Sequence, residues 1–91
     1  MSGLRPEIAD LAHRYRALLE LDFGSRLREV VVFGSQARGD ADTESDLDVA
    51  VIISGLTESE RDRAIRLAFE AWWDAGRTGP LVQPLVWSDV E

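Results

Sequence analysis

The stretch "VVFGSQARGDADTESDLDVAVII", residues 31–53, contains two apolar segments on either side of a polar loop. The segments "EVVVF" (29–33) and "LDVAVII" (47–53) are predicted to be strands. Their nearly continuous β-branched character is typical of strands that are covered on both faces. Carboxylates stand at every second position through the loop and into the second strand: Asp40, Asp42, Glu44, Asp46 and Asp48. The stretch therefore predicts two core strands joined by a strongly acidic loop.

Helical periodicity appears on both sides of this stretch. Residues 6–22 are predicted to form a first helix, which Gly24 ends. The segment "TESERDRAIRLAFEAWWDAG" is predicted to form a second helix. Thr57 and Glu60 would form its capping box, and Gly76 would be its C-cap. On the second helix we expect one buried face, formed by Ile65, Ala68, Phe69 and Trp72. Of the two adjacent tryptophans, one should therefore lie outside the core.

A third strand is predicted over residues 80–87, "PLVQPLVW". Pro84 cannot donate to a strand ladder and therefore favours an edge or a bulge. The following "SDVE" resembles a helix start with Ser88 as cap. The order helix, strand, loop, strand, helix, strand predicts an α+β (α/β-like) fold, a small mixed sheet flanked by helices. A purely parallel sheet is disfavoured because residues 34–46 are barely enough for a crossover.

Composition excludes several classes of protein. We expect 91 residues to form a single domain, 1–91, with a modest core. No cysteine is present, so disulfides and thiolate sites are excluded. The ten basic residues are all arginine, and the net charge is −7. This negative charge argues against broad nucleic-acid binding. It favours two kinds of partner: small anions held through a metal, or a basic protein. We find no membrane span and no secretory signal and expect a cytoplasmic protein.

Asp46 and Asp48 stand two positions apart where the second strand begins, so their side chains point to one face. At a separation of ~4 Å and an effective dielectric of ~20 they repel each other by about 4 kcal/mol. A protonated member, an arginine or a divalent cation would compensate. Magnesium is commonly bound through one or two carboxylates together with substrate phosphates, and this pair matches that requirement.

Gly34 and Ser35 follow the first strand. Glycine permits a sharp turn and a close ligand approach, and "SQAR" can form a helical turn whose free N–H groups point at an anion. Arg38 can neutralise phosphate or pair with a carboxylate. A phosphate cradle opposite a magnesium-binding pair indicates phosphoryl or nucleotidyl transfer. An EF-hand calcium loop is excluded, because Ser45 occupies its glycine position and Val51 the position of its bidentate glutamate.

The motif "FGSQARGDADTESDLDVAVI" resembles the signature of the DNA polymerase beta superfamily of nucleotidyltransferases, in its minimal nucleotidyltransferase (MNT) branch. The resemblance implies ATP or another nucleoside triphosphate (NTP) held through Mg²⁺, and transfer of a nucleoside monophosphate to a hydroxyl. It implies phosphate or nucleotide binding by Gly34, Ser35, Arg38 and Ser45, and metal binding and catalysis by Asp46 and Asp48. Minimal members of the family are often encoded as antitoxins beside a HEPN-type toxin, and some are similar to enzymes that add AMP to a tyrosine of that toxin.

The chain departs from this family pattern at the third carboxylate. The matching strand, "LVQPLVW", has Gln83 at the expected position, and an amide is a poor magnesium ligand and no general base. Asp89 and Asp74 are weaker substitutes. We therefore expect either an Mg²⁺-dependent nucleotidyltransferase acting on a partner protein or a small molecule, or a catalytically weak MNT-fold antitoxin that neutralises its partner by binding, with Trp73 and Trp87 as contact residues. A homo-oligomer is also compatible with the sequence.

Overall fold

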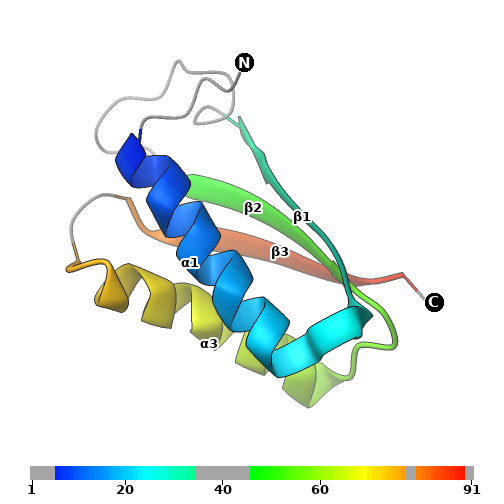
Figure 1. The fold of residues 1–91 in the computed structure, drawn as a ribbon. Coiled ribbons are helices and arrows are strands. Elements are labelled where there is room, and N and C mark those ends of the chain that lie inside the picture. The colour runs from blue at the N-terminus through cyan, green and yellow to red at the C-terminus, as the bar shows by residue number, and fades with distance from the viewer. Residues whose placement is uncertain (1–5, 35–45, 78–79, 90–91) are drawn as a thin grey trace.

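The computed structural model describes residues 6–34, 46–77 and 80–89. Its elements are α1 (Pro6–Phe23), the 3₁₀ turn η1 (Gly24–Arg26), β1 (Leu27–Phe33), β2 (Leu47–Ile53), α3 (Glu58–Asp74) and β3 (Val82–Ser88). The sheet has the order β1-β2-β3, with β1 antiparallel and β3 parallel to β2 (Figure 1). The predicted α+β class and mixed sheet are confirmed. Pro84 lies on the edge strand β3, as predicted.

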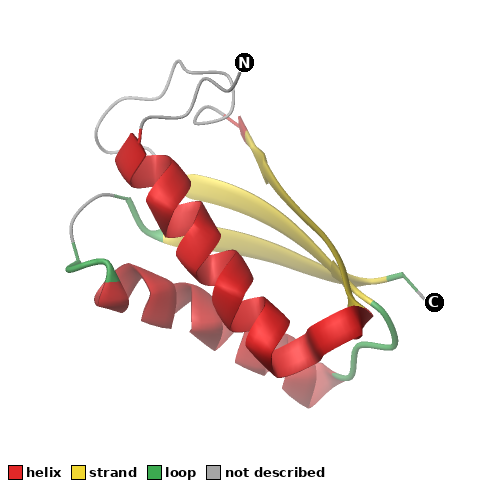
Figure 2. Cartoon of the chain, viewed as in Figure 1, coloured by secondary structure: helices red, strands yellow, loops and turns green. Residues whose placement is uncertain are grey.

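The sheet buries one face against the two described helices, which form a second layer (Figure 2). Side chains of β2 alternate between full and partial burial along the strand. The fully buried ones join the helices in one core: Leu47, Val49, Val51 and Ile53. The prediction that these strands are covered on both faces was wrong, because β1 is an edge strand and its alternate residues Val31 and Phe33 are exposed.

Helix α1 contributes one continuous apolar stripe to the core. Its buried residues recur at helical spacing: Ile8, Leu11, Tyr15, Leu19 and Phe23. The hydroxyl of Tyr15 donates to the main-chain oxygen of Ala64 at 2.9 Å and so joins α1 to α3. Burial raises the pKa of Tyr15, because the phenolate would be poorly solvated there. The helix ends just before Gly24, as predicted, and Gly24 has φ +57°. The lone histidine, His13, is exposed.

Helix α3 begins with the predicted capping box: Thr57 accepts from the Glu60 N–H at 3.2 Å, and Glu60 accepts from the Thr57 N–H at 3.0 Å. Gly76, at φ +90°, lies just beyond its end. The predicted buried face was right only in part. Ala68 is buried as predicted, but Ile65 and Phe69 are exposed, and α3 contributes Ala64, Leu67 and Ala71 to the core as well. Trp73 is exposed and Trp72 packs against the core, as expected for the pair.

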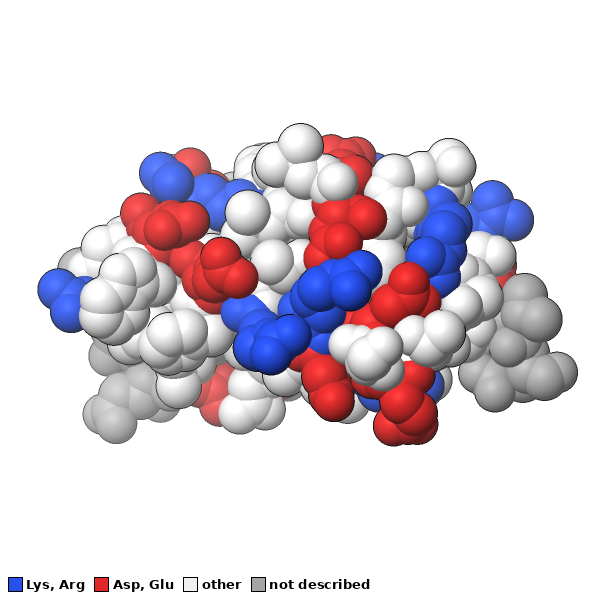
Figure 3. Space-filling model, turned by 90° about the horizontal axis from the view of Figure 1, so that it is seen from below, with Lys and Arg blue, Asp and Glu red and all other residues white. Residues whose placement is uncertain are grey.

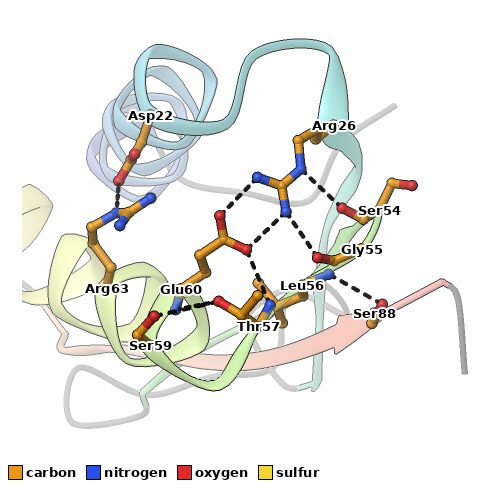
Figure 4. A network of polar contacts seen from close by, with 10 residues as sticks. All are labelled: Asp22, Arg26, Ser54, Gly55, Leu56, Thr57, Ser59, Glu60, Arg63 and Ser88. Atoms are coloured by element: carbon orange, nitrogen blue, oxygen red, sulfur yellow. Dashed lines mark hydrogen bonds and ion pairs between the residues drawn. The ribbon is translucent and has the colours of Figure 1, made fainter.

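A network of polar contacts ties the β2–α3 turn to the start of β1 (Figure 4). The Arg26 guanidinium donates to both oxygens of Glu60, at 2.7 and 2.8 Å, and to the main-chain oxygens of Ser54 and Gly55. The hydrogen bonds from Arg26 and from the Thr57 main chain lower the pKa of Glu60 to about 2. This end of the sheet is therefore held by side-chain contacts as well as by the main-chain hydrogen bonds between strands.

Ser88 belongs to β3, where its hydroxyl accepts from the Leu56 N–H at 3.3 Å. The prediction of a helix capped by Ser88 was wrong for the residues the structure describes: Ser88 completes a strand, and Asp89 follows as a bend.

Basic and acidic side chains are interleaved on the face seen in Figure 3. In the described part of the chain, ion pairs form on or between helices, for example between Arg63 and Asp22 at 2.6 Å and between Arg14 and Asp10 at 2.8 Å. This view shows no continuous basic field of the kind that nucleic-acid binding requires. Neither described helix has the length and apolar character needed to cross a bilayer.

Candidate functional site

Asp46 and Asp48 lie at the beginning of the central strand, one residue before it and within it. Leu47, between them, is fully buried in the core, and its N–H donates to the Leu81 main-chain oxygen at 2.9 Å. Both aspartates are half-buried. Because side chains alternate along a strand, the inward position of Leu47 directs both carboxylates to the opposite face, which the described helices do not cover.

Gly34 follows β1 and lies directly against Asp48. Phe33 is the register partner of Asp48, so the chain leaves β1 beside that carboxylate. Gly34 has φ +77°, a left-handed conformation that favours glycine. A Cβ built at this position would overlap Asp48 Oδ2. The bend after β1 and the carboxylate are therefore adjacent, and the close approach leaves no room for a side chain.

Gln83 is the register partner of Asp48 on the other neighbouring strand, so Phe33, Asp48 and Gln83 form one row across the sheet. Its Nε2 donates to Asp46 Oδ2 at 2.8 Å. The amide thus supplies a hydrogen bond to one of two neighbouring carboxylates. The sequence identified Gln83, but not this contact: we expected a proton, an arginine or a cation to offset the repulsion. The strand register was the missing information.

The weaker substitutes for a third carboxylate lie elsewhere. Asp89 follows the other end of β3 and accepts from Arg28 Nε at 3.1 Å, in an ion pair that joins the two edge strands. Asp74 ends α3, in the helical layer, where its charge acts on Arg14. Neither adjoins Asp46, so Gln83 is the side chain next to the pair on β3.

Three predicted site residues lie outside the described part of the chain: Ser35, Arg38 and Ser45. The acidic loop residues Asp40, Asp42 and Glu44 lie outside it as well. Among the predicted phosphate-binding and metal-binding residues, the structure therefore brings together Gly34, Asp46 and Asp48, with Gln83 beside them.

The donor set suits a hard divalent cation that also binds substrate. The described residues hold no cluster of three or more His, Cys, Asp or Glu side chains able to form a complete protein cage. Two carboxylates are present, and the Gln83 amide beside them donates a hydrogen bond to Asp46 and adds no third charge. Magnesium typically binds through one or two carboxylates and completes its shell with water and phosphate, so the residues fit.

Comparison with known proteins identifies the family to which this chain belongs. The nucleotidyltransferase domain family matches residues 15–79, which include β1, β2 and α3. A protein of Methanocaldococcus jannaschii, "Putative protein adenylyltransferase MJ0141", is 33% identical over 63 residues, which are 68% of this chain and 64% of that protein. This chain thus matches less than two thirds of that relative's length. No solved structure gives a significant match. The chain belongs to the nucleotidyltransferase domain family, as its sequence motif indicated.

Proposed function

We propose that this domain, residues 1–91, is a cytoplasmic Mg²⁺-dependent nucleotidyltransferase that moves a nucleoside monophosphate from ATP or another NTP to a hydroxyl of a partner protein. The observation that carries the proposal is the juxtaposition of Gly34 with Asp48 at the start of β2. Because Gly34 has no side chain, the carboxylate of Asp48 can approach the bend closely, and Asp46 and Asp48 together suit a metal that also binds substrate phosphates.

In the proposed reaction the acceptor oxygen attacks the α-phosphorus of the nucleotide. The bond from the α-phosphorus to the bridging oxygen breaks, pyrophosphate leaves, and the hydroxyl proton passes to solvent. Asp46 and Asp48 would hold the cation, which when bound offsets charge on the phosphates. The Gln83 hydrogen bond would orient Asp46. Gln83 has no basic group, so this row supplies no third carboxylate to deprotonate the acceptor.

A protein acceptor is supported by the similarity to the M. jannaschii relative, whose name describes it as a protein adenylyltransferase. By the family resemblance, a HEPN-type toxin is the proposed partner and the chain would act as its antitoxin. The second candidate is a catalytically weak antitoxin that neutralises this partner by binding. The Gln83–Asp46 hydrogen bond favours it, because a neutral amide stands beside the carboxylate pair, where the family resemblance implies a third acid.

The test is to incubate the chain with the product of its neighbouring gene, Mg²⁺ or Mn²⁺, and ATP labelled on either the α- or the γ-phosphate. Nucleotidyl transfer labels the partner from α-labelled ATP only. Asp46→Asn and Asp48→Asn should abolish the label, whereas Asp62→Asn, at an exposed position of α3, should leave it unchanged. If the wild type transfers nothing and both site variants still neutralise the partner, the binding candidate is correct.

A further inference from the structure

The sheet face opposite the helices carries a continuous apolar surface, which we call the open face. Leu85 and Trp87 are each 48% exposed and Val31 is 41% exposed. They alternate with the residues that enter the core, such as Val86 and Val30. The open face consists of Val31 and Phe33 from β1, Ala50 and Ile52 from β2, and Leu85 and Trp87 from β3.

Strand register makes the open face continuous with the candidate site. The row that contains Asp48 and Gln83 is followed along β2 by the row Val31, Ala50 and Leu85. Ile52 then pairs with Trp87. From the Asp48 row to the Ile52 row the distance is about 13 Å, at ~3.3 Å per residue. A molecule that packs on the open face therefore borders the carboxylates directly.

The dimensions suit one α-helix. The described residues form three strands of the sheet, so with a spacing of ~4.8 Å this backbone is about 10 Å wide, which is about the diameter of a helix. A helix lying along the strands would cover the apolar rows with about nine residues, at ~1.5 Å per residue.

A second copy of the chain suits this face poorly. Packing two open faces together would bring Asp46 and Asp48 of each copy against the other copy's surface and block access to them, and burying two neighbouring negative charges is costly. The negative charge of the chain also favours a partner other than a second copy. The chain carries a net charge of −7, and Glu29 is exposed on β1 beside the apolar rows. A helix flanked by lysine or arginine would complement it.

We propose that the open face docks an amphipathic helix of the acceptor protein, with an apolar stripe on Leu85 and Trp87, basic flanks, and a hydroxyl residue at the end nearest Asp48. This inference rests on the proposed function, since it assigns the acceptor-binding surface of the same site.

The probe is a dye-labelled helical peptide of about 14 residues, roughly four turns. It has a leucine stripe, lysines along both flanks and one tyrosine in a terminal turn. Binding to the full chain is measured by fluorescence anisotropy at low ionic strength. Leu85→Gln should raise Kd by about tenfold or more, equivalent to about 1.4 kcal/mol. Ile65→Gln is the matched control, because Ile65 is 45% exposed but lies on α3 in the helical layer. It should leave Kd unchanged.

Equal effects of Leu85→Gln and Ile65→Gln, or equal affinity for a peptide with glutamates in place of the lysines, would overturn the docking proposal. The docking proposal would also be overturned if sedimentation showed that the chain self-associates and that Leu85→Gln abolishes this self-association. The open face would then be an interface between two copies of the chain. Adding α-labelled ATP and Mn²⁺ separates the two proposals. If the peptide binds through the open face but its tyrosine receives no label, the result supports docking and counts against nucleotidyl transfer. Label that Leu85→Gln does not reduce supports transfer and counts against docking.

Discussion

Replacing Gly34 with alanine tests the relation between the bend after β1 and the carboxylate beside it. Gly34 has φ +77°, and an L-residue in the left-handed region costs about 1–2 kcal/mol. The new Cβ would also overlap Asp48 Oδ2. The atom that must move is the end of a side chain, so the added cost in stability is small. The consequence is a displaced carboxylate.

Gly24→Ala is the matched control. Gly24 has φ +57°, and a Cβ built there meets no atom within 4 Å. Both variants should therefore lose a similar free energy of unfolding in urea, about 1–2 kcal/mol. They should differ in metal affinity. Disturbing groups that orient metal ligands typically costs about 10–100-fold, so Gly34→Ala should raise the Kd for Mn²⁺ by that factor and Gly24→Ala should not.

The assay is a Mn²⁺ titration followed by electron paramagnetic resonance of the free ion, with the unfolding curve of each variant measured alongside. If Gly34→Ala and Gly24→Ala bind Mn²⁺ with the affinity of the wild type, then Asp48 does not hold the metal. A much larger loss of stability for Gly34→Ala than for Gly24→Ala would show that the carboxylate cannot move aside.

Three further predictions concern contacts elsewhere in the structure. Tyr15→Phe removes the buried hydrogen bond between α1 and α3 and should lower the free energy of unfolding by about 0.5–1.5 kcal/mol in urea denaturation. Because Arg26 lowers the pKa of Glu60 from 4.5 to about 2, this group stabilises the fold above pH 4.5; that contribution should fall as pH drops from 4.5 towards 2, and Glu60→Gln should flatten the profile in that window. Gln83→Asp places a third carboxylate beside Asp46 and should tighten Mn²⁺ binding, while Gln83→Ala should not; equal calorimetric affinities for the two variants would contradict a metal site at this row.

The chain's local signals predicted its elements well. Thr57 and Glu60 form the predicted capping box, and Gly24 and Gly76 stand where the two helices end. Pro84 correctly indicated an edge strand. These features depend on contacts between residues close in sequence, or on the backbone preferences of single residues. For that reason one sequence contains enough information to place them.

The sequence by itself determined the order of elements, the acidic pair at Asp46 and Asp48 and the family motif around it. The tertiary structure decided which face of the sheet the helices cover, and thereby left Leu85 and Trp87 exposed. It also decided that Gln83 donates to Asp46 while Asp89 pairs with Arg28 at the other end of β3. An apolar pattern records that a side chain avoids water, but not what covers it. Strand register joins residues far apart in the chain, so it arises only when the sheet assembles.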